Sequence, residues 1–168
     1  MAVTQQLARI SAAQLEACQQ SVDELERLCS FEMAPQPDHL DLDWAPEPLL
    51  WVCALTCADD ALAVLRRALS GDGEVNSDYR DHPGAVWGQP VTFLSPVGVA
   101  AVALALRETD SVMVAALSSH SAEASAVTVE MLPGVEEPQA YLTRHFAALL
   151  AFYTEAARRG LAVVLWWD

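Results

Sequence analysis

The stretch from Tyr141 to Asp168 constrains the fold more than any other part of this sequence. Apolar side chains recur at helical spacing across its first two thirds, at Leu142, Phe146 and Leu149 among others. Two arginines and then Gly160 follow, which is typical of the end of a helix. The run Leu161 to Trp167 is apolar without alternation and predicts a strand that is buried on both faces. A helix followed at once by such a strand indicates a fold that contains both helices and a sheet.

The tryptophan pair at the end of that strand is predicted to be core rather than a binding surface. Neighbouring residues of a regular strand point to opposite faces of the sheet, so Trp166 and Trp167 cannot form one aromatic patch. We expect at least one of them to pack beneath a helix. The alternative is that Trp167 lies at the end of the strand and lines a cleft.

The other segments predict an α+β (mixed α/β) fold. Val3 to Ile10 reads as a strand, and capping boxes at Ser11/Gln14 and Ser21/Glu24 predict two short helices. The predicted helices cover 12–19, 22–30, 47–55, a segment from Asp59 to just before Gly71, a segment from Pro96 onward, and 110–118. Residues 125–132 alternate and are β-branched, which favours a second strand. We therefore expect one domain, 1–168, with several helices on a small sheet that includes the C-terminal strand.

Composition and charge exclude several functions. The net charge of −14 disfavours binding to nucleic acid and to anionic lipid. Eleven acidic residues and two arginines lie in residues 1–60, so this acidic third could attract a basic partner protein; alternatively, the acidity only keeps an apolar chain soluble. No apolar run approaches the length of a membrane helix, and the N-terminus does not resemble a signal peptide, so we expect a cytoplasmic protein.

The four cysteines predict neither a disulfide nor a metal site. Cys53 and Cys57 share a helix face, but a zinc site needs two further ligands and no second close Cys/His pair exists. Reduced thiols in the core are the preferred interpretation. No phosphate-binding loop, dinucleotide fingerprint or serine-nucleophile motif is present, so we expect no cofactor.

Two polar segments supply the candidate binding residues. The long Gly/Pro-rich segment 71–90 contains Tyr79, Asp81, His82 and Trp87, and loops of this length are often functional. A carboxylate beside a histidine can set its tautomer or its pKa. The segment "DHLDLD" adds Asp41 and Asp43. Its alternating oxygens are similar to a calcium loop, but the glycine and the distal glutamate of such a loop are absent, so no metal is predicted.

Two functional hypotheses remain open. The first is a non-enzymatic protein-binding module, of an inhibitor or immunity type, that holds a basic partner through the acidic N-terminal third and the 76–90 loop. The second is a small hydrolase or ligand-binding enzyme with Asp81 and His82 in its cleft. A concave pocket with His82 and acids would favour the enzyme, and a convex acidic face would favour the binder. The oligomeric state is not determined by the sequence.

Several segments together resemble the YfbM-like family of small bacterial proteins of unknown function. The similarity is carried by "LARISAAQLE", by "VWGQPVTFLSPVGVAAVALAL" and by the final "YLTRHFAALLAFYTEAARRGLAVVLWW". In "LDLDWAPEPLLWVCAL", Trp44 stands where the family has a lysine and Pro46 where it has a tryptophan. If relatives use that segment as a site, the resemblance implies that this chain lacks it. The family has no established activity, so the resemblance implies a fold and no function.

Overall fold

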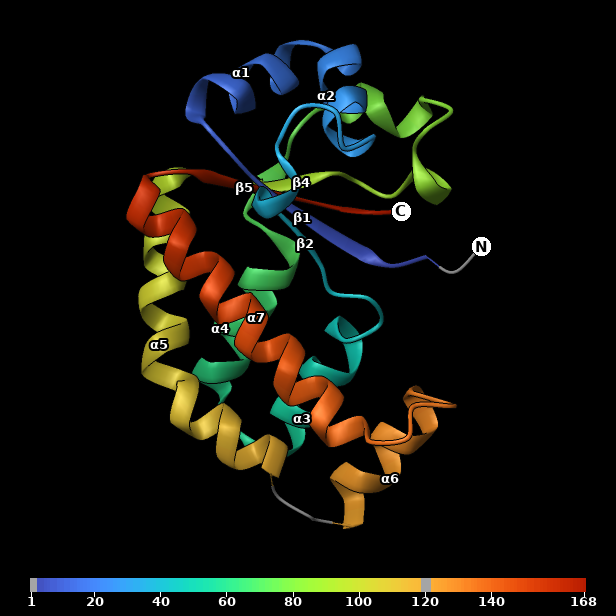
Figure 1. Ribbon diagram of the computed structural model, residues 1–168, viewed down its shortest axis with the longest axis vertical. Coiled ribbons are helices and arrows are strands. Elements are labelled where there is room, and N and C mark those ends of the chain that lie inside the picture. The colour runs from blue at the N-terminus through green and yellow to red at the C-terminus, as the bar shows by residue number, and fades with distance from the viewer. Residues whose placement is uncertain (1–2, 119–121) are drawn as a thin grey trace.

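The computed structural model describes residues 3–118 and 122–168, apart from the side chains of Trp87, residues 122–124 and Val127. The described residues form seven α-helices, three short 3₁₀ helices and one five-stranded sheet (Figure 1). The predicted α+β class is confirmed, and the C-terminal strand lies inside the sheet as expected.

The sheet has its two longest strands near its centre. The strand order is β2–β1–β5–β4–β3, and all four neighbouring pairs are antiparallel. The bounds are β1 Gln5–Ile10, β2 His39–Asp41, β3 Gly73–Glu74, β4 Thr92–Leu94 and β5 Ala162–Trp167. Strands β1 and β5 pair along their whole length, from Gln5 opposite Trp167 to Ile10 opposite Ala162. The β5 strand is therefore covered on both edges as well as on both faces, which explains its unbroken apolar sequence.

The two faces of the sheet are covered by different layers (Figure 1). On one face lie α1 (Ala12–Gln20), α2 (Val22–Cys29) and the 3₁₀ helix η2 (Ser77–Asp81). The other face carries α3 (Pro46–Thr56), α4 (Asp59–Ser70), α5 (Pro96–Ser118), α6 (Ala122–Met131) and α7 (Pro138–Arg159). The acidic first third of the chain thus spans both layers, and its carboxylates do not gather on a single face.

Alternation along the central strands divides the core in two. Leu7, Val163 and Leu165 face the layer of α3–α7, whereas Ala8, Val164 and Trp166 face α1 and α2. Trp166 is 4% exposed, so the prediction that one of the two tryptophans is core is confirmed.

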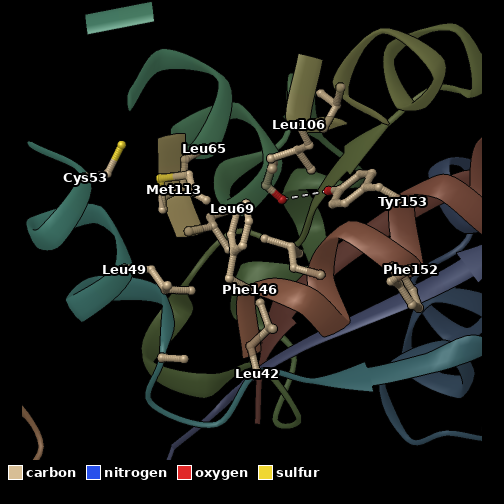
Figure 2. Packing of buried hydrophobic residues seen from close by; sticks show 14 of the residues in the cluster. Leu42, Leu49, Cys53, Leu65, Leu69, Leu106, Met113, Phe146, Phe152 and Tyr153 are labelled. Carbon is tan, nitrogen blue, oxygen red and sulfur yellow. Dashed lines mark hydrogen bonds between the residues drawn. The ribbon is translucent and has the colours of Figure 1, made fainter. Parts of the chain in front are cut away.

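The thicker core is built around the C-terminal helix. Phe146 and Tyr153 of α7 are buried against α4 and α5 (Figure 2). The hydroxyl of Tyr153 donates to the carbonyl of Ala68 in α4 at 2.6 Å, so the one polar atom of that side chain is satisfied inside the core.

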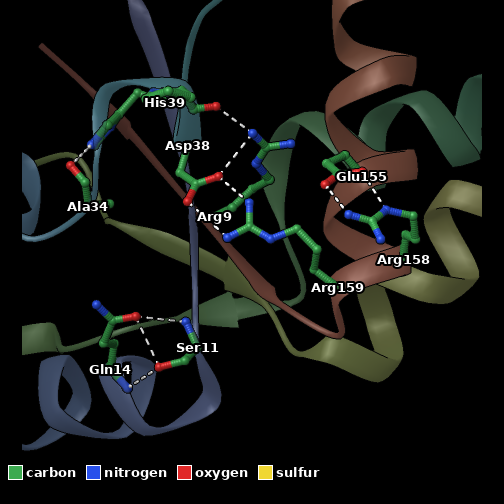
Figure 3. A network of polar contacts seen from close by, with 10 residues as sticks. Arg9, Ser11, Gln14, Ala34, Asp38, His39, Glu155, Arg158 and Arg159 are labelled. Atoms are coloured by element: carbon green, nitrogen blue, oxygen red, sulfur yellow. Dashed lines mark hydrogen bonds and ion pairs between the residues drawn. The ribbon is translucent and has the colours of Figure 1, made fainter.

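A buried ion group fastens the connection between α2 and β2 to the rest of the fold. Asp38, in the 3₁₀ helix η1 (Gln36–Asp38), contacts Arg9 of β1 and Arg159 at the end of α7 (Figure 3). Arg9 also donates to the carbonyl of Pro37. The side chains of Asp38 and Arg9 are each 9% exposed. A charge this deeply buried is stable only when it is paired with an opposite charge. The three side chains must therefore stay together, and this fixes where the chain enters β2.

Local signals predicted most helix ends correctly. The Ser11/Gln14 capping box forms in both directions, and Ser21 accepts from the backbone N–H of Glu24. Ser95 likewise accepts from the N–H of Gly98 at the start of α5.

Two expectations were wrong. Residues 125–132 are not a strand, because α6 runs from Ala122 to Met131 and packs on α3. Packing against a helical layer outweighs the β preference of its branched residues. The helix expected at 110–118 is the second half of one continuous helix, α5. Within the described residues, no helix is long and apolar enough to cross a membrane.

Candidate functional site

A broad hollow lies where the sheet ends beside Asp168. We call it the main cleft; it is lined by Val3, Thr4, Gln6, Phe31, Gln36, His39, Asp41, Ala85, Val86 and Asp168. Its volume is about 1070 Å³. Strands β1 and β2 form the floor, and the segments after α2 and before η3 (Val86–Gly88) form the walls.

A smaller hollow adjoins the main cleft. We call it the side pocket; it is lined by Glu26, Cys29, Ser30, Phe31, Tyr79, Gly84, Trp166, Trp167 and Asp168 and has a volume of about 300 Å³. Phe31 and Asp168 line both hollows. Trp167 is partly exposed and lines the side pocket, so the alternative that it borders a cleft also holds.

An aromatic group separates the two hollows. The ring of Phe31 lies 5.1 Å from that of His39 and 5.7 Å from that of Trp166. His39 and Trp166 meet edge to face at 6.1 Å. The three rings come from the loop after α2, from β2 and from β5, so only the tertiary structure brings them together.

Two ring nitrogens of this group have no hydrogen-bond partner among the described residues. The Nε2 of His39 lies 3.1 Å from the carbonyl of Ala34, which assigns its proton to Nε2 and leaves Nδ1 as an acceptor (Figure 3). That Nδ1 and the Nε1–H donor of Trp166 are both buried and unpaired. A buried polar atom without a partner costs about 1–3 kcal/mol, and such atoms concentrate at functional sites.

Phe31 holds an unusual backbone conformation. The end of α2 closes as a Schellman motif, in which Phe31 N–H donates to the Leu28 carbonyl and Glu32 N–H donates to the Arg27 carbonyl. Phe31 takes the left-handed position of that motif, with φ 63°, where glycine is usual. Its side chain is nevertheless 43% exposed. A strained backbone that presents an exposed aromatic ring is a feature of binding sites.

The strain at Phe31 predicts an inverted order of stability between two variants. Phe31→Gly and Phe31→Ala remove the same ring, but only alanine keeps a Cβ in the left-handed region. We expect Phe31→Gly to be about 1 kcal/mol more stable than Phe31→Ala in urea unfolding. Ala101→Gly, at an exposed position inside α5, serves as the control and should instead be destabilised by about 1 kcal/mol relative to the unchanged protein. Equal stabilities of the two Phe31 variants would contradict a left-handed backbone at this position.

Glu26 organises the far wall of the side pocket. Its carboxylate accepts from the hydroxyl of Tyr79 at 2.6 Å and from Ser30 at 2.8 Å, and it lies 3.2 Å from Nδ1 of His82. Burial raises the pKa of Glu26, but these hydrogen bonds and the nearby His82 outweigh it and hold the pKa below its usual value. Burial, aided by the bond to Glu26, raises the pKa of Tyr79. The group therefore anchors the 76–90 segment to α2 with a charged carboxylate and a neutral phenol.

Gly84 and Glu26 compete for the same nitrogen of His82. The N–H of Gly84 donates to Nδ1 at 3.1 Å, which requires a neutral imidazole, whereas an ion pair with Glu26 requires a protonated one. A Cβ at Gly84 would meet the Glu26 carboxylate, so a larger residue there would require the Glu26 side chain to shift.

The structure separates the residues predicted as a binding site. Asp41 lines the main cleft, and Tyr79 lines the side pocket. His82 contacts Glu26 and stacks on Tyr79, while Asp81 is exposed and lines neither hollow. The side chain of Trp87 lies outside the described residues.

Asp43 belongs to a different polar group. It has φ 52°, and its N–H donates to Asp41 Oδ1 at 2.7 Å. It faces Tyr141, whose pKa rises to about 12 mainly through burial and in part through Asp43. The ring of His145 lies 4.3 Å from that of Tyr141, and burial lowers the pKa of His145.

Sequence reasoning missed several residues that line the two hollows. Phe31 and Glu26 gave no signal, because one is an isolated aromatic and the other reads as the charged face of a helix. His39 was visible only within "DHLDLD", and Trp166 only as half of the tryptophan pair. In the described part of the chain, no cluster of three or more His, Cys, Asp or Glu residues is placed to hold a metal ion.

The charged side chains that line the two hollows are acidic. Their described lining contains three acidic residues, Glu26, Asp41 and Asp168, and no arginine. The arginines Arg9 and Arg159 are engaged elsewhere, by Asp38. The site therefore attracts positive charge and presents an aromatic ring beside it.

Comparison with known proteins supports the fold and leaves the chemistry open. No curated protein matches this chain in sequence. The crystal structure of YfbM from Escherichia coli, a protein of unknown function, is similar with a TM-score of 0.61 and 18% sequence identity, over 96% of this chain and 98% of that one. Residues 1–166 match the family described as "Domain of unknown function (DUF1877)". These matches confirm the resemblance expected from the sequence, and the chain belongs to the DUF1877 family.

Proposed function

We propose that this protein binds a basic segment of a partner protein in the main cleft. The observation that carries the proposal is the lining itself, because carboxylates and an exposed aromatic ring share one hollow without an arginine among its described residues. An arginine side chain suits such a lining, since its guanidinium pairs with carboxylates and stacks on aromatic faces.

The size of the cleft is compatible with a chain segment. Its volume of about 1070 Å³ lies at the upper end of the ~300–1,000 Å³ range of typical small-molecule sites. The net charge of −14 adds long-range attraction for a basic partner. Within the acidic N-terminal third, Asp41 lines the main cleft and Glu26 lines the adjoining side pocket.

The alternative of a hydrolase at the 78–87 loop has less support. Asp81 does not line either hollow, and His82 is engaged by Glu26 and Gly84. The hydroxyl of Ser30 donates to the Glu26 carboxylate, which Tyr79 and His82 also engage. The pKa of Glu26 lies below its usual value, so this carboxylate is a weak base for activating a nucleophile.

Peptide binding tests the proposal through a matched pair of charge changes. The probe is a fluorescein-labelled Gly-Arg-Gly-Arg-Gly-Arg-Gly peptide, measured by fluorescence anisotropy at two salt concentrations. Asp41→Asn removes a cleft carboxylate but keeps the oxygen that accepts from Asp43 N–H. Glu108→Gln removes the same charge from an exposed position on α5, in the layer across the sheet. We expect Asp41→Asn to weaken binding about threefold to tenfold and Glu108→Gln to change it less than twofold.

The two variants distinguish binding at the main cleft from non-specific attraction of the peptide to the net charge of the protein. Equal losses in the two variants would mean that the peptide senses only net charge, and the proposal would be wrong. A second comparison uses Phe31→Leu, which keeps an apolar side chain but removes the ring. This variant should lower the affinity for the arginine peptide more than the affinity for a matching peptide with ornithine in place of arginine. The reason is that only the arginine peptide loses the stacking of a flat guanidinium on the ring.

A further inference from the structure

The ring of Phe31 is the wall between the main cleft and the side pocket. It is one of two residues that line both hollows, and the other, Asp168, lies at the strand end. Moving this ring outward would join the hollows and uncover what lies behind it. The residues behind it are His39 and Trp166, whose rings it touches.

The covered residues carry opposite hydrogen-bonding groups. Trp166 offers an N–H donor, and the Nδ1 of His39 is an acceptor in the tautomer that donates to Ala34. Both atoms are buried and unpaired among the described residues, and Trp166 as a whole is 4% exposed. A group that carries both an acceptor oxygen and an N–H donor, as a carboxamide does, is chemically complementary to these two atoms.

The position of Phe31 suits a cover better than a core residue. Phe31 is 43% exposed, so displacing its ring uncovers less apolar surface than displacing a fully buried phenylalanine would. Its backbone is held in the left-handed region by the Schellman motif, so a change of conformation at residue 31 releases strain. The rings of His39 and Trp166 would remain as an aromatic base beneath the opening.

We propose that Phe31 covers a binding subsite formed by His39 and Trp166, which takes an uncharged planar group of the carboxamide class when the ring of Phe31 is displaced. The subsite goes beyond the proposed function, because it rests on different atoms and does not require a cationic ligand. In a protein ligand, an asparagine or glutamine side chain or an exposed peptide group has this chemistry. In a small ligand, an aromatic carboxamide has it.

The test measures the dissociation constant of benzamide by isothermal titration calorimetry. Phe31→Ala removes the cover, and we expect it to bind benzamide about tenfold more tightly than the unchanged protein, because the open state no longer has to be populated first. Adding Trp166→Phe to Phe31→Ala removes the N–H donor and keeps an aromatic side chain, and it should weaken that binding about fivefold. Leu55→Ala, at an exposed apolar position of α3 similar in exposure to Phe31, should bind as the unchanged protein does.

A second measurement, by NMR, uses the unchanged protein and therefore does not depend on how well the Phe31→Ala variant folds. In the unchanged protein, the indole N–H of Trp166 is assigned by its loss in Trp166→Phe, and saturating benzamide should shift this resonance more than those of the other indoles. The proposal is overturned if Phe31→Ala binds benzamide no more tightly than Leu55→Ala, or if the Trp166 resonance does not move. Because benzamide is neutral, this result is independent of whether the arginine peptide binds.

Discussion

Replacing Asp38 with alanine is expected to lower the free energy of unfolding by about 3–5 kcal/mol, since it removes the carboxylate partner of the buried Arg9. The Arg9 side chain is 9% exposed and lies 3.0 Å from Asp38. Without the carboxylate, its charge stays in a poorly solvated position beside Phe152, over whose ring it lies at 4.6 Å. Urea unfolding, followed by circular dichroism, measures the loss.

A surface ion pair of the same helix gives the matched control. Glu155 accepts two hydrogen bonds from Arg158, whose side chain is 70% exposed, and the Glu155 side chain is itself 37% exposed (Figure 3). Solvent screens such a pair, so Glu155→Ala should leave the unfolding midpoint almost unchanged. If Asp38→Ala were as mild as Glu155→Ala, the buried ion group would not be what fastens η1 to β1 and α7.

The ion group of Asp38, Arg9 and Arg159 should also make the stability of the unchanged protein depend on pH in the acid range. Hydrogen bonds from Arg159 hold the pKa of Asp38 below its usual value despite burial, with Arg9 adding to the effect. Because the folded pKa lies below the unfolded pKa of about 3.9, the stabilisation is complete above that value. It is lost as the pH falls further, through the folded pKa. Asp38→Asn should therefore lose less stability between pH 5 and pH 2, approximate limits of the relevant window, than the unchanged protein.

The second large effect is expected in the core of the thicker layer. Phe146 of α7 is 1% exposed and packs among Leu49, Leu69 and Leu106 of three other helices (Figure 2). Phe146→Ala removes most of this side chain and leaves a cavity between α7 and its neighbours. We expect a loss of about 3–5 kcal/mol in the free energy of unfolding.

An exposed leucine of a neighbouring helix provides the comparison. Leu104 on α5 is 57% exposed, so Leu104→Ala deletes apolar atoms that water already reaches and should cost no more than about 0.5 kcal/mol. Urea unfolding of both variants measures the difference. A loss below about 1 kcal/mol for Phe146→Ala would mean that the helices move together and close the cavity.

The helix ends and the central strands were predictable because their causes are local. Ser11 and Gln14 bond to each other's backbone within one turn, and Gly160 ends α7 with φ 65° directly after two arginines. The unbroken apolar run of β5 signals burial on both faces, and this signal can be read from that segment alone. These features depend on neighbours in the sequence, so they can be read without the fold.

The short strands and α6 were not predictable for a physical reason. Strands β2, β3 and β4 have two or three residues each, which is too short for a repeating pattern. They are strands because partners offer free edges: β2 bonds to β1, β4 bonds to β5, and β3 bonds to β4. In α6, the alternating β-branched residues favour a strand, but contact with α3 and α7 selects the helix.

The candidate site divides in the same way. The sequence by itself marked Asp41, Tyr79 and His82 as polar residues of non-repetitive segments, and it determined the acidic character of the whole chain. Only the tertiary structure decided that Asp41 faces the main cleft, that Tyr79 and His82 anchor to Glu26, and that Asp81 stands apart. Phe31, His39 and Trp166 are distant in the chain, and they form one aromatic group because antiparallel pairing brings β2, β1 and β5 side by side. Local sequence carries the signals of backbone conformation, whereas a site assembled across strands exists only once the register of the sheet is set.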